Sequence, residues 1–132
     1  MERDVDTKAL IERHWRASEA GDVEAEHDIY APGAVLDYPQ SGERFCGRDT
    51  IQQQRASHPA ERHFTVRRIL GHHDLWVSEC VITYDGSPTY SISIMELDNG
   101  HVMHETQYFA DPFAPSPGRA RLAERIPDTT EQ

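Results

Sequence analysis

One stretch of the sequence carries most of the information about the fold, and it runs from residue 13 to residue 47: RHWRASEAGDVEAEHDIYAPGAVLDYPQSGERFCG. Gly21 is expected to end a helix, because glycine adopts the left-handed conformation without steric cost. Asp22 then serves as an N-cap, since its carboxylate can accept a hydrogen bond from a free amide of the next turn. His14 and Tyr38 occupy positions where an apolar side chain would be simpler, so they are candidates for function.

Three helices are predicted in the first half of the chain. The first spans residues 4–20 and presents an inward stripe at helical spacing. The second is short, from residue 23 to residue 30, and is ended by Pro32 and the glycine after it. The third spans residues 48–57 and stops before Pro59, because the residue preceding a proline avoids the helical region. The inward stripe of the first helix consists of Leu10, Ile11, His14, Trp15 and Ser18.

Strands are predicted from residue 34 onward. Residues 34–38 form a short strand that Pro39 ends, and residues 39–47 form a polar turn or a frayed edge. Later in the chain the sequence becomes rich in β-branched and aromatic residues, as strands are. Asp85-Gly86 and Asn99-Gly100 are strong hairpin signals between these runs. The four runs are residues 63–70, 75–84, 88–97 and 101–110. Helices followed by an antiparallel meander predict an α+β fold.

Composition limits the classes of function. A chain of 132 residues with 37% hydrophobic content suits one domain. A net charge of −10 argues against nucleic acid and membrane surfaces as partners, because both select basic proteins. No apolar run approaches the roughly 20 residues of a membrane span, and the N-terminus lacks a signal-peptide core. Two cysteines, Cys46 and Cys80, are too few for a disulfide scaffold, so a cytoplasmic protein is expected.

The sequence contains no motif for a metal or a cofactor, and none is predicted. His72 and His73 are adjacent, and adjacent strand residues point to opposite faces. His101 and His104 are three residues apart on a strand and are likewise separated. The chain lacks H-E-x-x-H and C-x-x-C spacings, a P-loop, a G-x-G-x-x-G loop and a nucleophile elbow. The doublet at residues 67–68 is expected to form surface ion pairs.

The order of elements, EAGD at residues 19–22, YAPGAVLDYP at residues 30–39 and the closing hairpins resemble the NTF2-like superfamily, and within it the SnoaL-like branch. The resemblance covers about residues 5–113. It implies a cone in which a curved, mainly antiparallel sheet wraps around three N-terminal helices and leaves an internal pocket. Residues 1–113 are therefore expected to form the domain. Residues 114–132 are a Pro-rich extension, with a short helix near residues 119–125 and a disordered end.

The resemblance also implies positions for a site. In the related ketosteroid isomerases, a helix tyrosine and a strand acid form the oxyanion hole, and a carboxylate on the first strand is the base. These positions fall on His14, Ser93 and Tyr38, so steroid-type isomerisation is not expected. The Asp-Arg-Asp set of the limonene epoxide hydrolases has no match either. In SnoaL-like cyclases the acid/base carboxylate lies late in the sheet, which implies Glu105.

Glu105 is the principal catalytic candidate. A carboxylate that faces an apolar cavity loses hydration, which raises its pKa toward neutrality and suits a general base. A salt bridge to an arginine would explain the residue equally well. A register slip by one residue would instead turn His104 inward.

His14 and Tyr38 have alternative interpretations too. His14 either relays a proton or fills the core. Tyr38 either donates a hydrogen bond to a ligand oxygen or lines the wall, and in a flipped strand Asp37 would face inward instead. Cys80, in such a wall, would have a raised pKa and be inert. The residues predicted to bind substrate are Trp15, Trp76, Cys80, Ser93, Met95, Gln107 and Phe109.

Two functions remain open at this point. One is an enzyme without a cofactor that binds an apolar, carbonyl-bearing molecule. In it, Glu105 abstracts a proton while His14 and Tyr38 stabilise the resulting oxygen charge, as in cyclase, isomerase or dehydratase chemistry. The other is a non-catalytic binding or scaffold module, which a cavity below about 150 Å³ would favour. A homodimer is expected through the outer sheet face, which carries Val77, Val81, Ile92 and Ile94.

Overall fold

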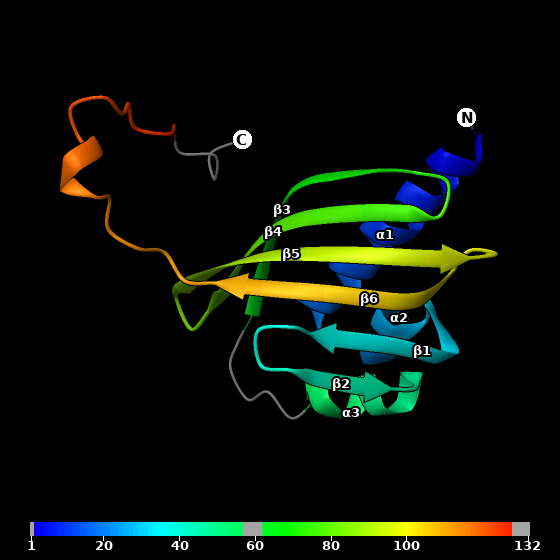
Figure 1. Cartoon of the computed structure of the whole chain (residues 1–132). Coiled ribbons are helices and arrows are strands. Elements are labelled where there is room, and N and C mark those ends of the chain that lie inside the picture. Colours follow the sequence, from blue (N-terminus) through cyan, green and yellow to red (C-terminus); the bar gives the residue numbers. More distant parts are fainter. Residues whose placement is uncertain (1, 57–61, 128–132) are drawn as a thin grey trace.

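The computed structural model of the chain describes residues 2–56 and 62–127. Its six strands form one sheet in the order β2-β1-β6-β5-β4-β3 (Figure 1). Neighbouring strands are antiparallel except β1 and β6, which run parallel. The elements are α1 (Glu2–Ala20), α2 (Val23–His27), β1 (Tyr30–Tyr38), β2 (Glu43–Cys46), α3 (Arg48–Ala56), β3 (Arg62–His72), β4 (Leu75–Tyr84), β5 (Ser87–Asp98), β6 (His101–Ala110) and the 3₁₀ turn η1 (Pro117–Arg119). The predicted α+β class is confirmed.

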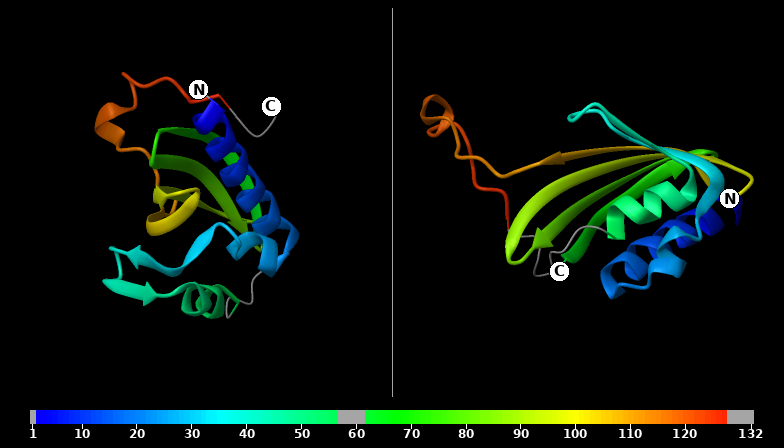
Figure 2. Two further views of the ribbon diagram at one scale, coloured as in Figure 1. Left: turned by 90° about the vertical axis from the view of Figure 1, so that its right-hand side faces the viewer. Right: turned by 90° about the horizontal axis from the view of Figure 1, so that it is seen from below.

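The sheet is curved, and the helices α1, α2 and α3 lie together on its concave side (Figure 2). The core fills the space between these two layers. Ile11 and Trp15 from α1 and Ile51 from α3 meet buried residues of the sheet there. The predicted cone is therefore present. None of the helices in the described part of the chain is long and apolar enough to cross a membrane.

The junction between the first two helices forms as predicted. Gly21 has a φ of +75°, and the Asp22 carboxylate accepts a hydrogen bond from the Ala25 amide at 3.2 Å. The predicted extension of α2 to Tyr30 is wrong, because the helix ends at His27. Tyr30 instead begins β1 and pairs with β6, and a tertiary pairing of this kind overrides local helix propensity.

The first hairpin also differs from the prediction. β1 begins at residue 30 rather than 34, and its pairing with β6 is irregular between Tyr30 and Val35. Pro32 lies inside this irregularity, where a missing backbone N–H costs no ladder hydrogen bond. Residues 43–46, predicted to be part of a polar turn or frayed edge, form the edge strand β2 against the end of β1.

The four later strands and their turns agree with the sequence prediction. Asp85 (φ +49°) with Gly86 and Asn99 (φ +52°) with Gly100 have positive φ at both central positions, as two-residue hairpins require. Period-2 alternation sends one set of side chains inward and the other outward. The inward residues of β4 and β5, which include the predicted Trp76, Cys80, Ser93 and Met95, are all buried; the others are Ser78, Ile82, Ser91 and Leu97.

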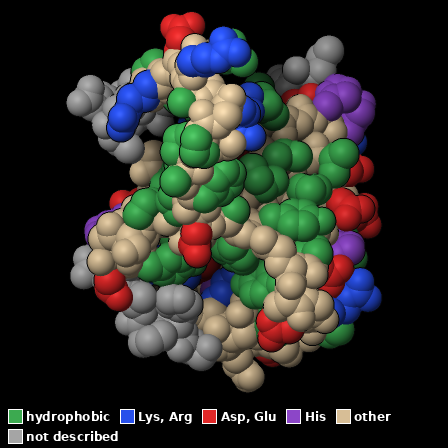
Figure 3. Space-filling view, turned by 60° about the vertical axis from the view of Figure 1, so that its left-hand side comes forward, with side chains coloured by type: hydrophobic (Ala, Val, Ile, Leu, Met, Phe, Trp, Pro, Cys, Tyr) green, Lys and Arg blue, Asp and Glu red, His purple; other side chains and the backbone are tan. Residues whose placement is uncertain are grey.

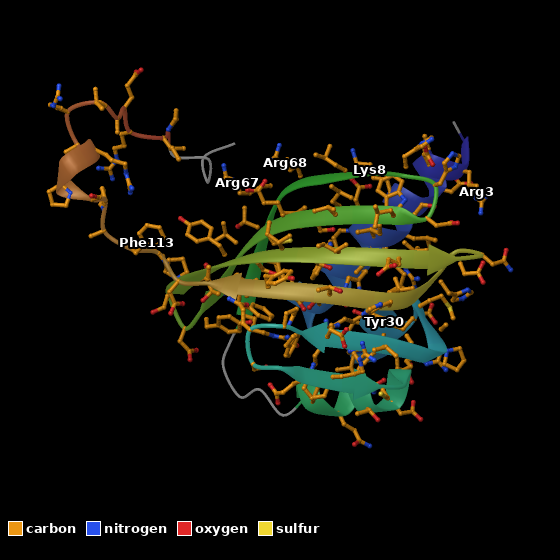
Figure 4. The ribbon with its side chains drawn as sticks, viewed as in Figure 1. Arg3, Lys8, Tyr30, Arg67, Arg68 and Phe113 are labelled. Atoms are coloured by element: carbon orange, nitrogen blue, oxygen red, sulfur yellow. The ribbon has the colours of Figure 1, made fainter. Side chains whose placement is uncertain are left out.

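The chain leaves the sheet after β6 and runs away from the body, with Phe113 85% exposed near the start of this segment (Figure 4). The only helical turn described there is η1, which is shorter than the predicted helix at residues 119–125. The predicted helix end at Ser57 lies outside the described residues. So does most of the predicted disordered end.

Candidate functional site

A buried ion pair lies at the centre of the concave face. The alternation of β6 turns Glu105 inward, where it is 0% exposed. α3 supplies Arg55 one turn after Ile51, whose buried side chain directs that face of the helix toward the sheet. Nη2 of Arg55 lies 3.2 Å from Oε1 of Glu105.

Further hydrogen bonds close this cluster. Ser93 Oγ donates to Glu105 Oε2 at 2.5 Å, and the Tyr30 hydroxyl donates to Oε1. Arg55 Nη1 donates to the Tyr30 hydroxyl oxygen at 2.6 Å, and Nη2 donates to Gln107 Oε1 at 3.2 Å. Both oxygens of the carboxylate and both terminal nitrogens of the guanidinium therefore have partners.

The environment of Glu105 reverses the predicted direction of its pKa shift. Burial alone raises the pKa of this carboxyl group. The positive charge of Arg55 and the hydrogen bonds from Ser93 and Tyr30 outweigh burial, and the net pKa is lowered. Glu105 is therefore ionised at neutral pH. The expectation of a raised pKa was wrong, and the alternative, a salt bridge to an arginine, is present with Arg55 as the partner.

His14 is buried but does not hydrogen-bond to Glu105. Its Nδ1 lies 2.6 Å from the backbone oxygen of Glu26, and its Nε2 is buried with no hydrogen-bond partner among the described residues. Burial lowers the pKa of His14, so the ring is neutral and Nδ1 donates. The ring packs edge-on against Trp15 and Tyr30, at 4.6 and 5.7 Å between centroids. The aromatic residue that hydrogen-bonds to the Glu105 carboxylate is Tyr30, through its hydroxyl group, and not His14.

Tyr38 faces inward, and the alternative with Asp37 inward does not occur. The Tyr38 hydroxyl accepts a hydrogen bond from Gln54 Nε2 at 3.0 Å. Asp37 lies on the opposite face, where it pairs with Arg44 at 2.7 Å and His104 at 2.8 Å. Hydrogen bonding from Arg44 lowers the pKa of Asp37 to about 2.

A cavity of about 60 Å³ lies beside the cluster, at the open end of the cone. Figure 3 shows hydrophobic side chains around a hollow on this side of the molecule, with a basic side chain inside it. The aromatic walls are Trp15, Tyr38, Phe64, Tyr84 and Phe109. The polar groups that reach the cavity include Ser18, Glu26, Gln54, Arg55 and Gln107.

The cavity separates the predicted site residues into two groups. Trp15, Tyr38, Gln107 and Phe109 line it. Glu105 lies behind Arg55 and is not among the lining residues. The other predicted residues, Trp76, Cys80, Ser93 and Met95, are packed in the core away from it. Burial raises the pKa of Cys80 to about 12, in agreement with an inert thiol.

Three residues of the site escaped the sequence analysis. Arg55 carried a usable signal, because it lies four residues after Ile51 on one face of a short helix. Tyr30 was hidden by the prediction that it ended a helix. Glu26 lies in the short second helix and was not predicted to belong to the site, yet it is 3% exposed and accepts a hydrogen bond from Ser18 Oγ at 2.9 Å. That contact depends on how α1 and α2 pack.

Comparisons with known proteins agree with this architecture. The model of the SnoaL-like domain family matches residues 11–105, and the chain belongs to this family. No curated protein matches the chain. Among solved structures, an NTF-2 like protein of unknown function from Burkholderia xenovorans LB400 is 48% identical, with a TM-score of 0.90. That match covers 96% of this chain and 100% of the other.

Two more distant structures share the fold. A protein from Kribbella flavida DSM 17836 named as a candidate ketosteroid isomerase is 24% identical, over 93% of this chain and 91% of that one, with a TM-score of 0.84. IdmH from Streptomyces antibioticus, named as a candidate polyketide cyclase, is 17% identical, over 78% and 91% of the two chains, with a TM-score of 0.66. At these identities the likeness concerns the fold.

Proposed function

We propose that this protein binds an apolar small molecule through a carbonyl oxygen at the open end of the cone. The observation that carries the proposal is the cavity, in which aromatic walls surround a small number of convergent polar groups. Arg55, Gln54 and Tyr38 offer hydrogen-bond donors to an oxygen placed there. Charged side chains of both signs line the cavity, with Arg55 and Arg62 against Glu26.

The size of the cavity limits how much of the ligand it holds. A volume of about 60 Å³ corresponds to roughly two water molecules. The carbonyl end of a ligand fits this space, while its apolar part lies at the mouth against aromatic side chains such as Phe64 and Phe109. A carbonyl oxygen that displaces water from the cavity can accept the hydrogen bonds that the water accepted, so these polar interactions are kept. The apolar part of the ligand then adds contacts with the aromatic side chains.

Within this proposal, Glu105 holds Arg55 in place and does not act as the base. Its carboxylate is fully engaged and its pKa is lowered, whereas a general base works best with a pKa near the operating pH. Glu26 is the carboxylate that reaches the cavity, and Ser18 is its hydrogen-bond donor. The second candidate function, proton abstraction next to the carbonyl, therefore assigns the base to Glu26.

The non-catalytic alternative is favoured by the small cavity, which lies below the threshold of about 150 Å³.

One experiment addresses both functions. Titration of a panel of ketones, with the corresponding hydrocarbons for comparison, measures binding by NMR. Deuterium exchange at the carbon next to the carbonyl, followed in the same samples, measures proton transfer.

Tyr38→Phe removes a cavity hydroxyl, and Tyr108→Phe removes a hydroxyl from the outer face as a matched control. We expect Tyr38→Phe to weaken ketone binding about 3- to 10-fold, the value of one hydrogen bond, with no change for Tyr108→Phe. Equal affinity for ketones and hydrocarbons would refute carbonyl recognition. Exchange lost in Glu26→Gln identifies an enzyme, and exchange lost only in Glu105→Gln would overturn the roles given to the two carboxylates.

We also propose that two copies associate through the outer sheet face. Val77, Val81 and Ile94 are half-buried on this face, and Ile92 is 37% exposed. Tyr90 and Tyr108 extend the apolar surface. A sheet with apolar residues on both faces needs a second cover, and a two-fold axis supplies it with identical residues.

A further inference from the structure

We propose that Asp4, His72 and His73 form a binding site for a divalent first-row transition metal ion such as Zn²⁺. The site lies where the first turn of α1 meets the turn between β3 and β4, a contact visible in Figure 1. It is separate from the cavity at the open end of the cone. Among the described residues, this is the one group of three metal-ligating side chains whose ligand atoms lie within 4.8 Å of one another.

The two imidazoles lie side by side, contrary to the prediction from strand alternation. β3 ends at His72, and His73 has a φ of +56°, in the left-handed region. Because His73 is no longer in extended conformation, its side chain is not turned to the face opposite His72. The ring centroids are 3.7 Å apart. The sequence prediction was wrong here because it extended strand geometry into the turn.

Asp4 completes the ligand set from another element. Its Oδ2 lies 2.7 Å from His72 Nδ1, and its Oδ1 accepts a hydrogen bond from the backbone N–H of His73 at 3.1 Å. Ligands of a tetrahedral zinc ion, bound at about 2.0–2.1 Å, are roughly 3.3 Å apart. Separations of at most 4.8 Å therefore reach this arrangement by small side-chain rotations.

The turn that presents the histidines is held firmly. The backbone oxygen of His73 accepts a hydrogen bond from Trp76 Nε1 at 2.9 Å, and Trp76 is buried. The backbone oxygen of Asp74 accepts a hydrogen bond from the Leu97 amide at 2.8 Å. A site built on fixed backbone loses little conformational entropy when the ion binds.

The chemistry of the site selects the class of ion. Two imidazole nitrogens and one carboxylate oxygen suit zinc, cobalt and nickel better than magnesium or calcium, which prefer oxygen ligands. His72 and His73 are exposed, so water can complete the coordination. Arg3, the neighbour of Asp4 in the chain, which Figure 4 labels at the N-terminal end of α1, pairs with Asp74 at 3.6 Å. Asp4 thus does not share its charge with that guanidinium.

A bound ion would join the start of α1 to the β3–β4 turn. Because Asp4 is 68 and 69 residues away in the chain from the two histidines, the ion binds the folded chain preferentially and stabilises it by mass action. The test uses tag-free protein and titration with Zn²⁺ by calorimetry. Co²⁺ provides a second probe, because its visible absorption reports nitrogen and oxygen coordination directly.

His73→Asn is the decisive variant, since asparagine tolerates a left-handed backbone and the turn is kept. His101→Asn, at the exposed start of β6, removes a histidine elsewhere and serves as the control. We expect one Zn²⁺ per chain, at least about tenfold weaker binding in His73→Asn and in Asp4→Asn, and wild-type binding in His101→Asn. Equal Zn²⁺ affinity in wild type and His73→Asn, or no Co²⁺ absorption in the wild type, would overturn the proposal.

Discussion

The guanidinium of Arg55 and the carboxylate of Glu105 meet at 3.2 Å although they are 50 residues apart in the chain. The two side chains are 9% and 0% exposed. Desolvating such a pair is costly, and the hydrogen bonds from Tyr30 and Ser93 offset part of that cost. The pair connects α3 to the centre of the sheet, and Arg55 is the member of the pair that lines the cavity.

Replacement of Glu105 by glutamine leaves Arg55 as a buried cation without a counterion. We expect the free energy of unfolding to fall by about 3–5 kcal/mol, as measured by urea denaturation. The control is Glu79→Gln, which removes an ion pair with Arg68 at 2.6 Å and a longer one with Arg67 at 3.9 Å. Because these pairs are partly exposed, their loss should cost less than about 1 kcal/mol. Equal losses in the two variants would show that the buried pair has no special role.

The stabilisation by Glu105 depends on pH in a defined direction. Its pKa is lowered from 4.5 in the folded protein, so the unfolded chain takes up the proton first as the pH falls. The contribution is complete above about pH 4.5 and is lost progressively below it. The stability difference between wild type and Glu105→Gln should therefore be largest at neutral pH and shrink in acid. Unfolding curves between pH 7 and 3 measure it, and a pH-independent difference would contradict the assignment.

Gly71 is required by the close approach of β3 to β4. A Cβ added there would lie 2.3 Å from Trp76 Cδ2 and 2.6 Å from the backbone oxygen of Leu75. We expect Gly71→Ala to destabilise the protein by at least about 1–3 kcal/mol through overpacking. Gly33→Ala is the control, because an added Cβ there meets nothing within 4 Å. Thermal unfolding of the two variants side by side gives the comparison.

Ile92 tests the proposed dimer. We expect the wild type to sediment as a dimer at micromolar concentration and Ile92→Lys to sediment as a monomer, because lysine places a charge in an apolar contact. Leu10 on α1 was wrongly predicted to face inward, since it is 36% exposed. Leu10→Lys is therefore matched in exposure with Ile92, at 36% against 37%, and should remain dimeric. A monomeric wild type, or dissociation by both substitutions, would refute the outer face as the interface.

Local signals identified most elements of the fold but not every boundary. The Gly21-Asp22 junction and the Asp85-Gly86 turn were readable, because they depend on backbone preferences of single residues. The start of β1 and the strand β2 could not be predicted from such local signals. Both depend on pairing with another segment, and Tyr30 enters a strand only because Val102 lies beside it.

The sequence alone determined the α+β class and the four-strand meander, since these follow from turn chemistry and period-2 alternation. The inward direction of Tyr38 and Glu105 was implied by the family resemblance, with Asp37 and His104 left open as alternatives, and the structure chose between them. Tertiary structure decided the charge state around Glu105, because Arg55 reaches it across a distance that no local pattern encodes. It also decided that Glu26 reaches the cavity and that His73 lies beside His72. Electrostatics and side-chain proximity depend on distances in space, and only the packed chain sets those distances.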